Sequence, residues 1–504
     1  MLPAGGGASR RGERNAGETA RRGGLDIRSA GLLLHPTSLP GPFGVGDLGP
    51  AADRFLDWAS SAGQTIWQVL PLGPTGFGSS PYGALSAFAG NPLLLSPERL
   101  VEDGLVSASA IRDVPDFPAE RVEWDSARDW KERLLRCAWS RTEKSAVLSA
   151  DLDRFRSAPE QRPWLSDWAL FAARRATGSM SGARELADEI AYQEFLQLLF
   201  FRQWGRLRDE AARRGIALFG DVPIYVSRDG VEVSTHPDLF ALDASGLALE
   251  VAGVPPDFFS RTGQLWGYPL YRWDRMEQNG FAWWIERLRA AFRRTDVVRL
   301  DHFRGFVAYW AVPAASATAA EGEWRPGPGR RLFDAVERAL GRLPLVAEDL
   351  GTITPDVRAL LAELGLPGMK VLQFAFFEPN SAYLPHNHVA NSVVYTGTHD
   401  NDTARGWWGS LSGEERQRVH DYLGSDGHEI EWDLIRAAYG SVAERAIVPI
   451  QDVFGLGSEA RMNTPGEGVG NWSWRARAGD FRPDRAARLS RLAVLTGRSG
   501  SSRT

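Results

Sequence analysis

Short hydrophobic runs recur along the chain, and most of them end in a polar or charged residue. Each run is a few residues long and rich in β-branched side chains, which is typical of strands buried in a parallel sheet. The eight runs are GLLLH ending at His35, TIWQVLP at 65–71, IALFGDVP ending near Asp221, VVRLD ending at Asp301, LVAED ending at Glu348 and Asp349, MKVLQF around Gln373, SVVYTGTHD ending at Asp400, and AIVPIQD ending at Asp452.

Between most of these runs, hydrophobic residues recur at helical spacing. Such patterns cover residues 51–63, 192–215, 280–294 and 354–365. The last pattern opens with Thr354, a suitable N-cap, followed by Pro355. Strand and helix alternating eight times predict an α/β fold, the (β/α)8 or TIM barrel, whose chemistry sits on loops at the C-terminal ends of the strands. The polar residues that end the runs fall in those positions.

Spacing and composition also predict the domain organisation. Residues 1–28 are rich in Gly and Arg and are expected to be disordered. Residues 29–497 are expected to form one barrel domain, because no low-complexity linker divides them. Long intervals between strands predict insertion subdomains at the C-terminal mouth, at about 72–215 and 223–275. Residues 498–504 are expected to be a frayed tail.

Composition and charge narrow the class of protein. The chain has 504 residues and a formal net charge of −5, so no overall positive field draws it to nucleic acid or to an anionic membrane. No hydrophobic run reaches the ~18 residues of a membrane span, and the N-terminus lacks the apolar core of a secretory signal. The single cysteine, Cys137, excludes an intramolecular disulfide and is expected to be a buried structural thiol. Together these features favour a cytoplasmic protein.

Three carboxylates end three of the predicted strands: Asp301 the fourth, Glu348 the fifth and Asp400 the seventh. In a closed barrel the C-terminal ends of the strands meet at one mouth, so these side chains can face a common ligand. Cleavage of a glycosidic bond uses such a set, with one carboxylate as nucleophile and one protonated carboxyl group as acid. The acid must keep its proton near neutral pH, which burial near other carboxylates favours.

Basic and imidazole side chains surround these carboxylates. Arg299 lies two residues before Asp301, so on a strand both point to the same side. The guanidinium could hold a nucleophilic carboxylate ionised, or the two could form a purely structural ion pair. His302 and His399 could each hydrogen-bond a ligand hydroxyl. A metal site at His399, Asp400 and Asp402 is a further alternative, but the spacing matches no known metal motif.

Two aromatic segments follow predicted strands and could cover a ligand. Residues 252–271, AGVPPDFFSRTGQLWGYPLY, include Asp257, Gln264 and Trp266 and predict a loop that acts as a lid. Residues 457–474 place Asn463 in a similar position after the eighth strand. A packed surface loop is the alternative for the first segment. No nucleotide-binding motif is present, so no cofactor is expected.

Several long motifs carry a resemblance that runs from about residue 29 to about residue 495. They are HPTSLPGPFGVGDLG, SPYGALSAFAGNP, GDVPIYV, GVPPDFFSRTGQLWG, VRLDHFRGF, VAEDLG, TGTHDND and GLGSEARMNTPG. In these motifs the chain resembles the 4-α-glucanotransferases of glycoside hydrolase family 77, the amylomaltases or disproportionating enzymes. The resemblance implies a barrel of the α-amylase clan with insertions at its mouth. It also implies a retaining double displacement that moves α-1,4-glucan segments to the 4-hydroxyl of a sugar.

The resemblance also assigns expected roles to residues of this chain. It implies that Asp301 is the nucleophile, Glu348 the acid/base, and Asp400 a third carboxylate that binds substrate hydroxyls. The expected substrate-binding residues are Tyr82, Asp257, Gln264, Trp266, Arg299, His399 and Asn463. The chain departs from the family where Ser234-Thr235 replaces the commoner Trp-Ala and where Gly83 replaces a Gln, which affects details of glucan binding rather than the chemistry.

The expected substrates are maltooligosaccharides, amylose or glycogen-derived α-glucans, with glucose as an acceptor. No metal ion is expected in the site. A hydrolase that uses the same carboxylates and takes water as acceptor is the alternative activity. A non-catalytic glucan-binding protein on this scaffold would be expected to lack at least one of Asp301, Glu348 and Asp400, and all three are present.

Overall fold

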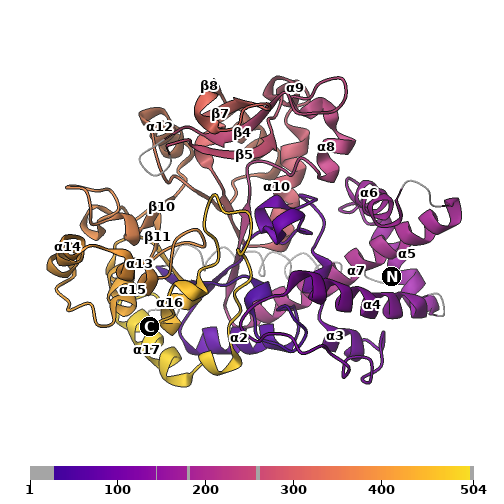
Figure 1. Cartoon of the computed structure of the whole chain (residues 1–504), viewed down its shortest axis with the longest axis horizontal. Helices are drawn as coiled ribbons and strands as arrows, with labels where there is room; N and C mark the ends of the chain where they lie inside the picture. The colour runs from indigo at the N-terminus through magenta and orange to yellow at the C-terminus, as the bar shows by residue number, and fades with distance from the viewer. Residues whose placement is uncertain (1–27, 143–144, 179–181, 257–260, 500–504) are drawn as a thin grey trace, which may run out of the picture.

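The computed structural model describes residues 28–142, 145–178, 182–256 and 261–499. Asp257 and nearly all of the segment predicted to be disordered therefore lie outside the described residues. Figure 1 shows helices on opposite sides of a central barrel and a small separate sheet at the top of the view. Among the described residues, none of the helices is both long and apolar enough to span a membrane.

Eight parallel strands form the barrel, which confirms the predicted (β/α)8 fold. Their order in the sheet is β10-β11-β12-β1-β2-β3-β6-β9. All eight hydrophobic runs contribute one strand each, and nearly every strand residue is buried. The strands are β1 (Ser29–Leu33), β2 (Ile66–Gln68), β3 (Ala217–Val222), β6 (Val297–Leu300), β9 (Leu345–Ala347), β10 (Gly368–Val371), β11 (Ser392–Tyr395) and β12 (Arg445–Pro449).

The barrel closes between β9 and β10 without a regular ladder. The backbone N–H of Ala347 donates to the carbonyl of Pro367 at 2.9 Å. One step further, the N–H of Met369 donates to Oδ1 of Asp349 at 2.6 Å, so a side-chain oxygen replaces the next main-chain acceptor. A side chain at Gly368 would clash with the Asp349 carboxylate, which lies 2.4 Å from where a Cβ would be. The strand that carries Glu348 is thereby joined to its neighbour at the mouth.

Helices cover the barrel where the sequence predicts them. The four predicted segments form α2 (Pro50–Ser61), α7 (Ala183–Arg213), α10 (Ala282–Arg294) and α12 (Pro355–Leu364). Thr354 is the N-cap of α12 as predicted, although its side chain makes no capping hydrogen bond. Gly365 ends α12 with φ 61°, a left-handed conformation that favours glycine. The remaining helices after β8 are α11 (Arg330–Leu340), α13 (Ala404–Ser410), α14 (Gly413–Leu423), α15 (Ile430–Gly440), α16 (Ile450–Phe454) and α17 (Pro483–Leu495).

The long interval between β2 and β3 contains helices beside the barrel. They are α3 (Pro97–Glu102), α4 (Trp124–Thr142), α5 (Ala146–Ser157) and α6 (Leu165–Thr177). The interval ends with α7, which packs on α2 and β3. In Figure 1, α4, α5 and α6 lie to one side of the barrel. The division of the chain into insertion subdomains remains a prediction.

A four-stranded antiparallel sheet takes two of its strands from the segment that the sequence predicts to be a lid loop. Its order is β5-β4-β7-β8, formed by β4 (Glu250–Val254), β5 (Gln264–Pro269), β7 (Ala308–Pro313) and β8 (Glu323–Pro326). Short helices α8 (Val231–Thr235) and α9 (Trp273–Gln278) flank it in the chain. The expectation of a loop throughout 252–271 is therefore wrong. The hydrophobic pattern does not predict β4 and β5 because both strands are short. In addition, β4 pairs with β7, which lies more than fifty residues further on.

Arg498 fastens the C-terminal end of the chain to the N-terminal ends of β1 and β12. Its side chain is fully buried and donates hydrogen bonds to five backbone carbonyl oxygens, those of Ser29, Tyr439, Ser441, Ala443 and Glu444. A frayed tail that starts at residue 498 is therefore wrong for this residue.

Cys137 also differs from expectation, because it is exposed on α4. The neighbouring positions Leu134, Leu135 and Ala138 form the buried face of that helix. The helical pattern around Cys137 was correct, but the thiol lies on the solvent side of it.

We predict that Arg498→Ala destabilises the protein strongly, because five carbonyl groups lose a charged donor in a buried place. The expected loss in the free energy of unfolding is on the order of 3 kcal/mol, measured by urea denaturation. Arg491→Ala, at an exposed position of α17, is the matched control and should change little. Equal stability of the two variants would contradict a role for Arg498 in holding the barrel closed.

Candidate active site

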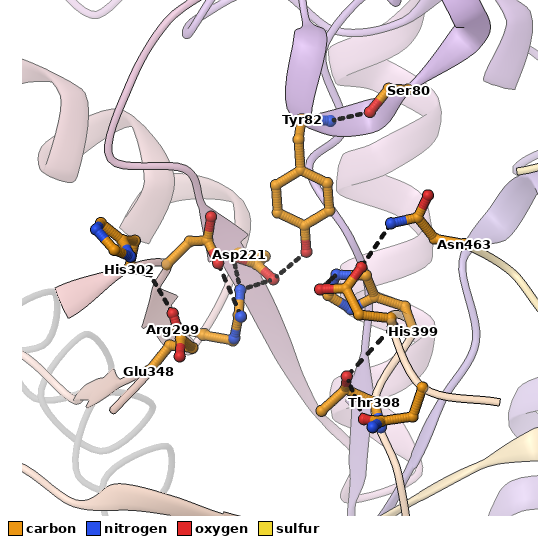
Figure 2. Close-up of polar contacts among 12 residues, drawn as sticks. Ser80, Tyr82, Asp221, Arg299, His302, Glu348, Thr398, His399 and Asn463 are labelled. Carbon is orange, nitrogen blue, oxygen red and sulfur yellow. Dashed lines mark hydrogen bonds and ion pairs between the residues drawn. The ribbon is translucent and has the colours of Figure 1, made fainter. Parts of the chain in front are cut away.

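Four carboxylates lie at or after the C-terminal ends of barrel strands, and Figure 2 shows two of them, Asp221 and Glu348, near Arg299. Asp221 lies within β3, Asp301 follows β6 directly, Glu348 follows β9 directly, and Asp400 lies in the loop after β11. Parallel strands of a barrel bring their C-terminal ends together, which explains how residues so far apart in sequence share one site.

Backbone hydrogen bonds continue the strand pairing into this site. The N–H of Asp301 donates to the carbonyl of Val222, and the N–H of Glu348 donates to the carbonyl of Leu300, both at 3.0 Å. Two of the carboxylates are therefore held by the sheet itself rather than by a free loop.

Arg299 is the centre of the charge network. One of its terminal nitrogens, Nη1, donates to both carboxylate oxygens of Asp221, at 2.9 Å and 2.8 Å. The other, Nη2, lies 2.8 Å from Oδ1 of Asp301. Arg299 is only 3% exposed, so water screens these charges little. The predicted pairing of Arg299 with Asp301 is present, and the guanidinium bridges two carboxylates instead of one.

Asp221 is the residue of this network that the sequence reasoning missed. Its side chain is fully buried, and its Oδ2 accepts a hydrogen bond from the Tyr82 hydroxyl at 2.8 Å. Burial raises the pKa of Asp221, and the charge of Arg299 opposes that rise. The available signal was its position, because it ends the third hydrophobic run as Asp301 ends the fourth.

Glu348 has the environment of a proton donor. Its Oε2 accepts the backbone N–H of His302 at 2.7 Å, and its Oε1 accepts the backbone N–H of Leu350 at 2.8 Å. Burial raises the pKa of Glu348 to about 7; the charge of Asp301 adds to the rise, whereas Arg299 and the two N–H groups oppose it. A carboxyl group with this pKa can both hold and release a proton near neutral pH.

The backbone of His302 has an uncommon conformation that serves this contact. Its φ is 49°, in the left-handed region that non-glycine residues seldom adopt. This turn directs its N–H at Glu348 immediately after the strand that carries Asp301. Burial lowers the pKa of the His302 imidazole to about 4, so the ring is neutral near pH 7.

Asp400 lies on the opposite side of the mouth and is the more exposed carboxylate, with 44% of its side chain accessible. Nδ2 of Asn463 donates to its Oδ1 at 2.6 Å, and Nε2 of His399 lies 3.4 Å from its Oδ2. Arg461 donates to its backbone carbonyl at 2.7 Å. Asp400 is thus oriented by neighbours while it remains accessible to a ligand.

Aromatic rings line this side of the site. The Tyr82 ring stacks on the His399 imidazole with centroids 5.0 Å apart and planes 19° apart. Trp472 lies 5.9 Å from each of these two rings and has φ 63°. Flat apolar faces of this kind suit the apolar faces of sugar rings.

Gln264 and Trp266 approach from β5 of the antiparallel sheet. Nε1 of Trp266 donates to Oε1 of Gln264 at 3.2 Å, and the Trp266 ring meets the His302 ring edge-to-face at 4.8 Å. Of these two predicted residues, Trp266 therefore contacts His302, whose backbone N–H donates to Glu348.

Among residues 28–142, 145–178, 182–256 and 261–499, no group of three or more His, Cys, Asp or Glu side chains could hold a metal ion. Asp402, considered as a ligand from sequence, instead accepts hydrogen bonds from the Ser458 hydroxyl at 2.7 Å and from the Thr403 N–H at 2.8 Å.

Comparison with known proteins shows the family to which this chain belongs. A family model described as 4-alpha-glucanotransferase matches residues 34–480. The chain belongs to the 4-alpha-glucanotransferase family. It is 46% identical over 498 residues to the 4-alpha-glucanotransferase of Synechocystis sp., covering 94% of this chain and 99% of that protein. The Thermus thermophilus 4-alpha-glucanotransferase is 47% identical with the same coverage.

A solved structure supports the same membership. The amylomaltase from Streptococcus agalactiae, in complex with acarbose, superposes with a TM-score of 0.89 at 36% identity, over 94% of this chain and 99% of that chain.

We predict that Asp221→Asn destabilises the protein, because Arg299 then loses its fully buried anionic partner and keeps only the partly exposed Asp301. The expected loss in the free energy of unfolding is on the order of 3 kcal/mol. Thermal unfolding should show this loss, whereas Asp129→Asn, at an exposed position of α4, should leave the transition unchanged. An unaltered transition for Asp221→Asn would mean that the Asp221–Arg299 contact contributes no net stability.

Proposed function

We propose that this 4-α-glucanotransferase moves α-1,4-glucan segments with Asp301 as nucleophile and Glu348 as acid/base. The observation that carries the assignment is the contrast between two neighbouring carboxyl groups. Asp301 is paired with the Arg299 guanidinium at 2.8 Å, whereas partial burial of Glu348 raises its pKa to about 7. A retaining transfer needs an ionised and a protonated carboxyl group together.

In the first step, an Asp301 oxygen attacks the anomeric carbon of the donor and forms a glycosyl ester. The bond from that carbon to the glycosidic oxygen breaks, and Glu348 gives its proton to the departing oxygen. Arg299 binds the Asp301 carboxylate and orients it for the attack. The product of this step is a free glucan with a new 4-hydroxyl and a glycosyl-enzyme with Glu348 ionised.

In the second step, the 4-hydroxyl of an acceptor sugar attacks the same carbon from the side that the first product left. Glu348 now takes the hydroxyl proton, and the ester bond to Asp301 breaks. Two inversions give net retention. The active site returns to its starting protonation state.

Asp400 and its neighbours bind the sugar whose bond is cleaved. Asn463 and His399 orient the Asp400 carboxylate, which can accept hydrogen bonds from sugar hydroxyls. The Tyr82 and Trp472 rings offer a surface against which the sugar ring can lie. We infer that these contacts strengthen as the sugar flattens toward an oxocarbenium-like transition state.

Gln264 and Trp266 favour a sugar acceptor over water. Both lie on β5, and Trp266 contacts His302 beside Glu348. An acceptor held against this strand would have its 4-hydroxyl close to the base. Asp257 belongs to the same proposed acceptor region and lies outside the described residues. Hydrolysis would be the outcome if the region did not exclude water.

The proposed substrates are maltooligosaccharides, amylose and glycogen-derived α-glucans, with glucose as an acceptor, and the proposed compartment is the cytoplasm. The amylomaltase from Streptococcus agalactiae, solved in complex with acarbose, supports a carbohydrate ligand for this chain. Neither step uses a group other than the side chains of this chain and the two sugars.

We predict that maltotriose alone gives a ladder of longer maltodextrins together with glucose, because the glycosyl-enzyme passes to another sugar. Chromatography of the products over time measures this. Asp301→Asn should bind maltotriose and produce no ladder. Glucose and maltose without any longer product from the unaltered protein would support the hydrolase alternative instead.

We predict that kcat/KM falls as pH rises through about 7, because the free enzyme must hold a proton on Glu348 for the first step. Initial rates from pH 5 to 9 test this. Glu348→Gln should lose turnover of maltotriose but still react with α-maltosyl fluoride, whose fluoride leaves without a proton. A kcat/KM that stays constant up to pH 9 would rule out Glu348 as the acid.

A further inference from the structure

A cavity lies behind the catalytic cluster, between the barrel wall and α10. It measures about 70 Å³ and is bounded by residues 69–73 after β2, residues 220–226 in and after β3, and the inward face of α10. Tyr82 and Asp221 form its wall toward the active site. A water molecule needs only about 10–15 Å³ of such space, so the cavity has room for a larger occupant.

Arg294, the last residue of α10, lines this cavity without a partner. It is 9% exposed, and its Nε is buried without a hydrogen-bond acceptor. No residue in the described part of the chain accepts a hydrogen bond from its guanidinium or forms an ion pair with it. The ring of Phe201 lies beside the guanidinium, with its centroid 5.2 Å from Cζ. Burial lowers the pKa of Arg294 to about 10, and no nearby anion offsets the effect.

Two other buried arginines donate hydrogen bonds to acceptors within the fold. Arg287, two turns earlier on α10 and on the same cavity, donates to the Ile224 carbonyl at 3.0 Å and to the Tyr271 hydroxyl at 3.3 Å. Arg498 donates to five carbonyl oxygens. The fold thus supplies hydrogen-bond acceptors to these two guanidinium groups. Among the described residues it supplies none to the guanidinium of Arg294.

An arginine that is only 9% exposed and whose Nε is buried without an acceptor is unfavourable unless an anion or water compensates it. We propose that the cavity binds a small monovalent anion of chloride size on the guanidinium of Arg294. The full charge of Arg294 exceeds the opposing partial charge of roughly −0.5 at the C-terminal end of α10. The carboxylate of Asp221, which also lines the cavity, is paired with Arg299.

The lining favours a halide over phosphate. Much of the wall is aliphatic, including Val69, Leu72, Val222 and Val298. The hydroxyl of Thr295 already donates to the Ala291 carbonyl, and that of Ser86 to the Glu232 carboxylate. A phosphate has four oxygens that need hydrogen-bond donors. A halide needs only the charged guanidinium and can be surrounded by apolar side chains on its other sides.

Thermal unfolding of the full chain tests the proposal. Sodium chloride should replace the sodium salt of 2-(N-morpholino)ethanesulfonic acid at constant ionic strength, since that bulky anion does not fit the cavity. The wild-type protein should show a saturating rise in Tm of about 2 °C or more, because a ligand that binds only the folded state stabilises it. Arg294→Met should lose the rise. Arg293→Met, the exposed neighbour on the same helix, should retain it.

Sodium phosphate forms a second arm of the same experiment. A rise that depends on Arg294 with phosphate and not with chloride would overturn the halide assignment. A wild-type Tm that is independent of both anions would show that only water fills the cavity and would overturn the proposal.

Diffraction from wild-type crystals grown in sodium bromide gives a test that needs no variant. The proposal requires an anomalous bromide peak against the Arg294 guanidinium. Absence of that peak at full bromide occupancy elsewhere in the crystal would contradict it, even if Arg294→Met fails to fold.

Discussion

The buried guanidinium of Arg299 is the constraint on which the site depends. One positive charge is shared by Asp221 and Asp301, which belong to the ends of neighbouring strands β3 and β6. Two carboxylates around one guanidinium leave an excess of negative charge, and Glu348 lies partly buried beside it. Burial and the charge of Asp301 together keep a proton on Glu348 up to a pH near 7. Two adjacent carboxyl groups therefore differ in environment, because Asp301 is paired with Arg299 whereas burial favours a proton on Glu348.

The barrel makes this arrangement rigid. Hydrogen bonds of the sheet continue from Val222 to Asp301 and from Leu300 to Glu348, so the reacting groups move only if the strands move. Asp400 differs, because side chains of the outer loops orient it and nearly half of it is exposed. This contrast suits a site in which the bond-making carboxyl groups stay fixed while sugars enter and leave past the third.

The sequence predicts the barrel because each buried strand is a continuous hydrophobic run that ends in a polar side chain. It predicts Asp301, Glu348 and Arg299 for the same reason, since strand ends converge and alternate residues share a side. Asp221 also ends a hydrophobic run but was overlooked, because its role depends on contacts with Arg299 and Tyr82 that only the folded structure shows. The antiparallel sheet and the anchoring of Arg498 depend on contacts between distant segments, which local patterns do not contain. The family resemblance supplied the roles of the three carboxylates, which spacing alone left open.

The most direct measurement of the central claim is to identify the residue that carries the glycosyl group. Glu348→Gln would be mixed with α-maltosyl fluoride, digested at low pH and analysed by tandem mass spectrometry. The account predicts a maltosyl ester on the peptide that contains Asp301, on the side chain of that residue. A maltosyl group on Asp400 or Asp221, or its absence while fluoride is released, would contradict the assignment of Asp301 as the nucleophile held by Arg299.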